Sequence, residues 1–258
     1  MFSVYLCRRF SIKHTIFIIM DYQELNYQSM SRDRELEVAS AFPVLMRKVY
    51  TWMTLALIIT GLSAYVVVNS QAAINLIYGH SAVVWVLFGL ELALVIGLTA
   101  AIDRLSLTTA TLMFIVYSVV NGLVFSSIFF AYTLSSISTV FFITAGTFAA
   151  MSAFGYFTNS DLSSWGRILI MALIGLIIAS IVNIFVKSSG LELLLSYGGV
   201  LIFVGLTAYD TQKIKQMFLQ APDASENTQK YALLGALSLY LDFINLFLYL
   251  LRIFGRRD

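Results

Sequence analysis

Seven long apolar blocks limit the fold of this chain more than any other feature of its sequence. In chain order the blocks are Val49–Val68, Ala82–Ile102, Leu107–Phe130, Ile137–Phe157, Ile168–Val186, Leu191–Tyr209 and Tyr231–Phe254. Each is close to the length of about 20 residues that a helix needs to cross a bilayer core of about 30 Å. Helices of soluble proteins carry an apolar stripe instead of a continuous apolar block. The pattern therefore predicts an all-α integral membrane protein with seven transmembrane helices.

The composition agrees with this class and excludes several others. Hydrophobic residues make up 59% of the chain and charged residues 12%, whereas about a quarter of the residues of a soluble domain are charged. A net charge of +2 is too small to indicate a nucleic-acid-binding surface. Cys7 is the only cysteine, and the chain has no zinc-binding, P-loop, dinucleotide or nucleophile-elbow motif. We therefore expect no enzymatic activity and no cofactor.

Mostly polar sequence precedes the first block. We expect residues 1–45 to form a flexible tail and residues 46–255 to form a single transmembrane domain. The N-terminal residues fit a signal peptide poorly, because their only unbroken apolar run after the basic residues is IFIIM. Translation that begins at Met20 or Met30 is an alternative. A second polar segment, Gln220 to Lys230, contains one of the two prolines and predicts an exposed loop.

The basic residues indicate how the helices are oriented. A cytoplasmic N-terminus would place most of them on the cytoplasmic side, as the positive-inside rule requires. The residues on that side are Arg47, Lys48, Arg104, Arg167, Lys213, Lys215 and Lys230. The opposite loops contain only Lys187, but the C-terminal Arg252, Arg256 and Arg257 break the pattern. Either the tail tolerates these charges or the last block does not fully cross. We favour seven spans with a cytoplasmic N-terminus.

Several acidic residues lie in or at the ends of the blocks. A charge at the centre of a membrane helix costs about 2.5–3.5 kcal/mol on insertion scales, so it needs a partner. Asp103 directly follows the second block, beside Arg104, which favours an interfacial position. Glu91, midway along the same block, is either protonated and hydrogen-bonded to a neighbouring helix or part of an ion pathway. Asp210 either pairs with Lys213, three residues further along the same helix face, or has a functional role.

Asp242 is the acidic residue for which a purely structural role is hardest to find. It lies in the segment SLYLDFINLFLYLLRIFG, where mainly apolar residues flank it on both sides. Arg252 is about 15 Å away along the helix axis, so the partner of Asp242 must come from another helix. Asp242 would lie mid-membrane if the last helix begins at Tyr231. It comes closer in depth to Asp210 if that helix starts a turn or two before the bilayer core or if the sixth helix continues through DTQKIKQMF.

Polar and small residues inside the blocks have two interpretations. Asn121 and Asn183 either form hydrogen bonds between helices or line a polar pathway, and we include Asn245 with Glu91 among the candidate ion-pathway residues. Small residues at helix-packing spacing occur around Gly146 in the fourth block and at Gly175 and Ala179 in the fifth. Simple packing between helices is the favoured interpretation of these small residues.

Two motifs, GLTAYDTQKIK and ALSLYLDFINLFLYLLRIFG, resemble the Bax inhibitor-1 (transmembrane BAX inhibitor motif) family, and its bacterial members in particular. The similar hydrophobic layout covers residues 45–255. The resemblance implies a seven-helix bundle in the bacterial inner membrane, with the C-terminal helix at its centre. It also implies a pH-sensitive calcium leak channel. In that channel Asp210 and Asp242 form the sensor pair and Arg104 is the latch at the junction of the second and third helices.

The implied pair makes physical sense. Two carboxyl groups in contact and away from bulk water cannot readily both ionise, so they are expected to share a proton. Calcium prefers about 6–8 oxygen ligands, so Asp210 and Asp242 are expected to bind Ca²⁺ only weakly and transiently. The expected partners are the lipid bilayer, Ca²⁺ and protons, and no nucleic acid.

Two other functions remain open. The first is a regulatory membrane protein that acts through contacts with a membrane-protein partner, for example by modulating a membrane protease or a stress response. Such contacts would involve residues 21–45 or the segment from Gln220 to Lys230. The second is a proton-coupled transporter, against which the lack of an evident internal repeat counts mildly.

Overall fold

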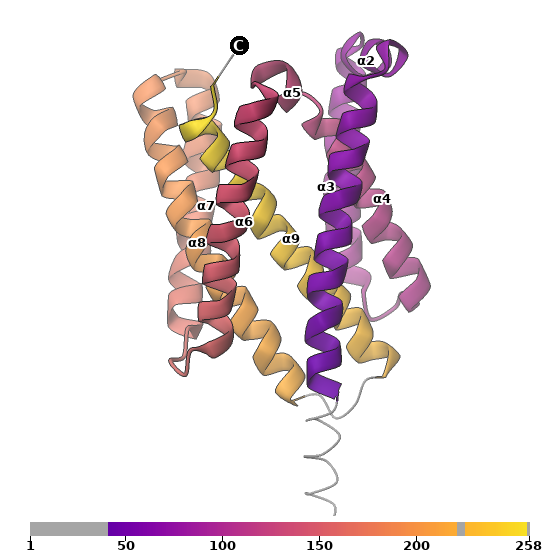
Figure 1. Ribbon diagram of the computed structural model, residues 1–258, viewed down its shortest axis with the longest axis vertical. Coiled ribbons are helices and arrows are strands. Elements are labelled where there is room, and N and C mark those ends of the chain that lie inside the picture. Colours follow the sequence, from indigo (N-terminus) through magenta and orange to yellow (C-terminus); the bar gives the residue numbers. More distant parts are fainter. Residues whose placement is uncertain (1–40, 221–224, 257–258) are drawn as a thin grey trace, which may run out of the picture.

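The computed structural model describes residues 41–220 and 225–256, which form a bundle of helices joined by short segments (Figure 1). Seven helices within these residues are long and apolar enough to cross a membrane. They are the first helix (Ala41–Val68), α3 (Ser81–Ala101), α4 (Leu107–Phe125), α6 (Leu134–Phe157), α7 (Ser163–Val186), α8 (Ser189–Gln220) and α9 (Glu226–Phe254). Two short helices, α2 (Gln71–Tyr78) and α5 (Ile128–Ala131), lie between them. The predicted seven-helix membrane fold is confirmed.

The sixth and seventh membrane helices are longer than the apolar blocks that predicted them. α8 continues past Tyr209 to Gln220, and α9 begins at Glu226 instead of Tyr231. The polar extension of α8 still carries an apolar stripe, because Ile214 and Phe218 are buried while the residues between them are mostly polar. The prediction of an exposed loop from Gln220 to Lys230 is therefore wrong for residues 226–230. Residues 221–224 lie outside the described part of the chain.

The first helix also begins earlier than predicted. Residues 41–45 are helical, and Leu45 is fully buried, although the sequence placed them in the polar tail. The aromatic and aliphatic side chains of this segment explain the difference, since they extend the apolar face of the helix that follows. The predictions for residues 1–40, including the alternative starts at Met20 and Met30, concern residues that the structure does not describe.

α9 forms the centre of the bundle. It packs against α4, α6 and α8, and Figure 1 shows it running obliquely between α3 and α4 on one side and α6 to α8 on the other. In the 18-residue apolar stretch of α9, 67% of the residues are buried, compared with 6% in the corresponding stretches of α3 and α7. The central position of the C-terminal helix is therefore confirmed. A central helix can hold a polar side chain because other helices, and not lipid, surround it.

The two ends of α9 lie at opposite ends of the bundle. Near its start, the Lys230 Nζ atom donates to the carbonyl oxygen of Leu105 in the α3–α4 loop (3.1 Å). Just after its end, the backbone N–H of Arg256 donates to the Ser136 hydroxyl at the start of α6 (3.1 Å). The last block therefore crosses the bundle completely. We call the end that contains the α3–α4 loop and the start of α9 the basic end.

Close packing between helices involves a glycine that the sequence did not single out. A Cβ atom added to Gly146 or Gly175 would meet no atom within 4 Å, so neither glycine supports a close helix contact as predicted. A Cβ atom on Gly155 of α6 would instead collide with the carbonyl oxygen of Ala208 and lie 2.9 Å from its Cα. The absence of a side chain at Gly155 lets α6 approach α8 two residues before Asp210.

Candidate functional site

Asp242 is a buried carboxyl group on the central helix. Its side chain is 4% exposed, and its Oδ2 atom has no hydrogen-bond partner among the described residues. Asp210 of α8 lies close enough for the two carboxyl groups to repel each other electrostatically. The structure therefore brings together the two aspartates that the sequence motifs predicted. A buried carboxyl group beside another one is energetically costly unless a proton or a cation lies between them.

Asp210 has two further neighbours. The Ser238 side chain of α9 hydrogen-bonds to its carboxyl group, and Lys213 lies near enough to attract it electrostatically. Ser238 and Asp242 are four residues apart, so both lie on the face of α9 that packs against α8. Asp210 therefore lies near Lys213 on its own helix, as one of the two interpretations expected, and it also faces Asp242 across the helix pair.

The lengths of α8 and α9 explain how the two aspartates reach the same depth. From Asp210 to the end of α8 at Gln220 is about 15 Å along the axis. From the start of α9 at Glu226 to Asp242 is about 24 Å. Because α9 runs obliquely through the bundle (Figure 1), each of its residues gains less depth than a residue of an upright helix. The oblique course of α9 therefore reduces the difference in depth between the two aspartates.

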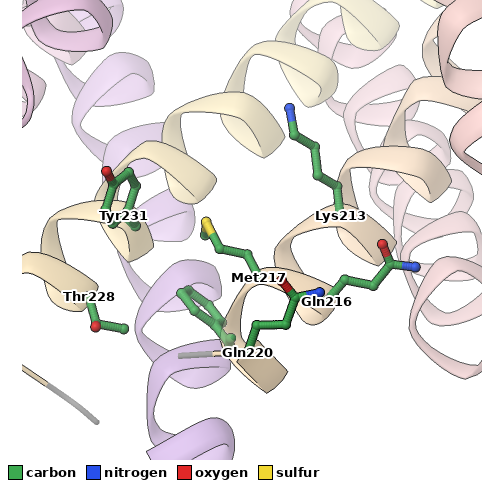
Figure 2. A pocket seen from close by; sticks show the side chains of 7 residues that line it. Lys213, Gln216, Met217, Gln220, Thr228 and Tyr231 are labelled. Atoms are coloured by element: carbon green, nitrogen blue, oxygen red, sulfur yellow. The ribbon is translucent and has the colours of Figure 1, made fainter. Parts of the chain in front are cut away.

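Two adjoining cavities lead from the basic end toward Asp210. The outer cavity, of about 450 Å³, lies between the last turns of α8 and the first turns of α9, with Lys213 and Gln216 on one side and Thr228 and Tyr231 on the other (Figure 2). The inner cavity, of about 490 Å³, shares Lys213 and Tyr231 with it and extends to Asp210. Asp242 does not line either cavity. Asp210 therefore separates the inner cavity from the more deeply buried Asp242.

The predicted latch residue does not contact the pair in this structure. Arg104 is exposed in the α3–α4 loop, and the charged group that acts on Asp210 is Lys213. Asp103, which precedes Arg104 in the chain, accepts a hydrogen bond from the hydroxyl of Tyr231 (2.8 Å). Since Tyr231 lines both cavities, this bond, which we call the clasp, connects the α3–α4 loop to the entrance of the site.

Only two of the four candidate ion-pathway residues meet. The Asn121 Nδ2 atom donates to Glu91 Oε1 (2.6 Å) and so joins α4 to α3. Asn183 Oδ1 accepts a hydrogen bond from the backbone N–H of Ser188 (3.1 Å), so it gives a partner to a backbone donor just after α7 ends. Asn245 donates to the Leu241 carbonyl oxygen of its own helix (2.8 Å). Asn183 and Asn245 therefore bond to nearby backbone of their own segments.

Ser238 and Tyr231 belong to the site although the sequence did not single them out. Their spacing could have indicated that they belong to the site, because residues 4 and 11 positions before Asp242 lie on the same face of a helix. The apolar surroundings of Asp242 drew attention to the acid alone. A count of polar residues along that single face would have found all three.

Comparisons with known proteins agree with the motifs. The family described as "Inhibitor of apoptosis-promoting Bax1" matches residues 43–258. The inner membrane protein YbhL of Escherichia coli K12 is 50% identical over 213 residues, which cover 82% of this chain and 91% of YbhL. Uncharacterized proteins of Borreliella burgdorferi and Rickettsia prowazekii are 45% and 42% identical over 212 residues, covering 82% of this chain and 91% and 89% of their own lengths. With its seven apolar helices and its pair of neighbouring aspartates, the chain belongs to the Bax inhibitor-1 family of multi-pass membrane proteins.

Proposed function

We propose that this protein is a pH-sensitive cation leak channel of the bacterial inner membrane, with calcium as the permeating ion and the Asp210–Asp242 pair as its gate. One arrangement carries the proposal. A buried carboxyl group with an unpartnered oxygen lies behind a second carboxyl group at the inner end of two adjoining cavities. The name of the similar E. coli protein supports the inner membrane as the location.

The gate depends on the proton that the two carboxyl groups share. With the proton in place, the pair forms a hydrogen bond between α8 and α9 and the path ends at Asp210. Loss of the proton leaves two like charges in a medium of low dielectric constant, and their repulsion favours separation of the helices. Separation would extend the inner cavity past Asp210 toward Asp242. Lys213, which lines the inner cavity, offsets part of the repulsion.

The chemistry of the site suits a passing calcium ion better than a stored one. Within the described residues, no group of three or more Asp, Glu, His or Cys side chains is placed to hold a metal. Asp210, Asp242 and the Ser238 hydroxyl offer fewer oxygen ligands than the 6–8 or so that calcium prefers. We therefore propose weak and transient coordination of Ca²⁺ by the two aspartates, as a leak pathway requires.

The orientation of the protein determines which compartment the gate senses. With a cytoplasmic N-terminus, the basic end faces the cytoplasm and the two cavities form a cytoplasmic vestibule. The proton reaching Asp210 then comes from the cytoplasm. Arg104 keeps its proposed role as latch, since the clasp ties its loop to Tyr231 at the vestibule.

Calcium flux into proteoliposomes at several pH values tests the proposal. The wild type is expected to show pH-dependent flux, and Asp210→Asn and Asp242→Asn are expected to lose that dependence. Glu192→Gln is the matched control, because Glu192 is an exposed acid in the first turn of α8, far along that helix from Asp210. The pH dependence of the control should equal that of the wild type.

Three outcomes would point elsewhere. Unchanged pH dependence in both aspartate variants would refute the gate. Absence of flux in every protein, together with a membrane-protein partner that is still retained after both aspartates are replaced, would favour the regulatory function. Calcium movement against its gradient, driven by a proton gradient, would favour a transporter.

A further inference from the structure

A second acidic site lies on the other side of α9, between α3 and α4. Asn121 of α4 is 1% exposed, and its Nδ2 atom donates to the Oε1 atom of Glu91 on α3 at 2.6 Å. The Oδ1 atom of the same amide is also buried, yet it accepts no hydrogen bond from the described residues. A buried acceptor without a donor is costly. We therefore expect a group beside this oxygen to donate a hydrogen bond to it.

A proton on Glu91 would supply that donor. A carboxylic acid and a primary amide are complementary, since the amide N–H donates to the acid carbonyl and the acid O–H donates to the amide carbonyl. The first of these two bonds is present. An ionised Glu91 offers only acceptors, so it cannot donate to Asn121 Oδ1. We propose that Glu91 is a second proton-binding site, held as a carboxylic acid by the Asn121 side chain.

Among the described residues Glu91 has no cation beside it, which favours the protonated form, whereas the hydrogen bond from Tyr117 favours the anion. Tyr117 of α4 is a hydrogen-bonding neighbour of both Glu91 and Asn121, and Tyr240 of α9 lies nearby. α2 also packs against α3, and its only titratable residue, Tyr78, is hydrogen-bonded to a serine hydroxyl. No lysine or arginine acts on Glu91 among the described residues. An anion at this position would therefore lack a cation to balance it.

This site is separate from the aspartate pair. Tyr240 and Asp242 are two residues apart on α9, which places them about 200° apart around the helix. Asp242 faces α8, whereas Tyr240 lies on the side of the first helix and α4, where its hydroxyl hydrogen-bonds to Thr60 (2.7 Å). The inference therefore stands whether or not the aspartate pair gates a channel.

Glu91 is open to a reagent dissolved in the bilayer. α3 lies at the periphery, because only 6% of the residues in its 18-residue apolar stretch are buried, and Glu91 itself is only half-buried. Dicyclohexylcarbodiimide partitions into membranes and reacts with protonated carboxyl groups. The acid oxygen adds to the carbodiimide carbon and the acid proton moves to a carbodiimide nitrogen. The resulting O-acylisourea then rearranges to a stable N-acylurea without any further reactant.

Labelling of the full chain in lipid vesicles at neutral pH, followed by peptide mass spectrometry, tests the proposal. We expect Glu91 to carry the carbodiimide adduct, the yield to fall as the pH is raised, and Glu91→Gln to lose the adduct. Glu192, an exposed glutamate in the first turn of α8, is the internal control and should remain largely unlabelled. Glu91→Gln keeps a donor and an acceptor beside Asn121, so we expect it to fold.

Infrared difference spectra of the wild type and Glu91→Gln at neutral pH decide the question even if the reagent does not reach the site. We expect the variant to lose the carbonyl stretch of a protonated carboxylic acid. Asn121→Leu should shift that band to higher frequency, because it removes both hydrogen bonds of the pair. Loss of a carboxylate band in Glu91→Gln, with no change in the carboxylic-acid region, would overturn the proposal.

Discussion

Replacing Gly155 by alanine tests how α6 positions α8. A Cβ atom at this position would overlap the carbonyl oxygen of Ala208 and lie 2.9 Å from its carbonyl carbon. The collision involves backbone, which cannot move aside as the end of a flexible side chain can. The two helices must therefore separate, and Asp210 must move with α8.

The size of the effect follows from comparison with Gly146, which lies on the same helix. Alanine is favoured over glycine in a helix by about 1 kcal/mol, and this gain applies to both positions. At Gly146 nothing opposes it, because no atom lies within 4 Å of the added Cβ. At Gly155 the overpacking costs about 1–3 kcal/mol. The free energy of unfolding of Gly155→Ala should therefore be lower than that of Gly146→Ala by about 1–3 kcal/mol.

Reversible unfolding of the purified protein in mixed micelles measures this difference. Gly146→Ala should be more stable than the wild type by up to about 1 kcal/mol. Gly155→Ala should be less stable than Gly146→Ala, and its stability should lie between that of the wild type and about 2 kcal/mol below it. Calcium flux measured on the same two variants shows whether the displacement of α8 also reaches the aspartate pair. Equal stability of the two variants would show that α6 and α8 are not in close backbone contact, which would refute the packing described above.

Three further changes test other contacts. Tyr231→Phe removes the clasp hydrogen bond to Asp103, so we expect faster amide exchange in the α3–α4 loop, measured by mass spectrometry, with the exchange of α7 unchanged. Tyr240→Phe removes a fully buried hydroxyl from its bond to a threonine of the first helix and should lower the free energy of unfolding by about 0.5–1.5 kcal/mol in micelle unfolding. Hydrogen bonds from Ser163 hold the pKa of Asp161 below its usual range, so the support that Asp161 gives to the start of α7 is present at neutral pH and is lost as the pH falls through that lowered pKa. Amide exchange at the start of α7 should therefore rise in acid for the wild type, and Asp161→Asn should abolish that dependence.

The fold could be predicted from the sequence because the bilayer imposes a simple requirement. Each apolar block had to become a helix, and the number and order of the helices followed. The ends of α8 and α9 could not be predicted in the same way. Residues from Asp210 to Gln220 are too polar for the bilayer core, and only the burial of Ile214 and Phe218 reveals that the helix continues there.

The candidate site was predictable in part. An acid among apolar residues is conspicuous, so Asp242 was found, and the motif around Asp210 supplied its partner. The pairing of Glu91 with Asn121 was not predictable, because it depends on the rotation of α3 relative to α4. The position of Arg104 likewise depends on a loop, whose conformation is set by contacts of Asp103 and Leu105 with the distant Tyr231 and Lys230.

The central claim is that a proton shared by Asp210 and Asp242 controls the position of α8 relative to α9. Structures of the protein in lipid at acidic and at alkaline pH test it most directly, through the distance between the two carboxyl groups. The account predicts carboxyl groups in hydrogen-bonding contact in acid. In alkali it predicts separated carboxyl groups, with the inner cavity extended past Asp210. The same separation of α8 and α9 at both pH values would contradict it.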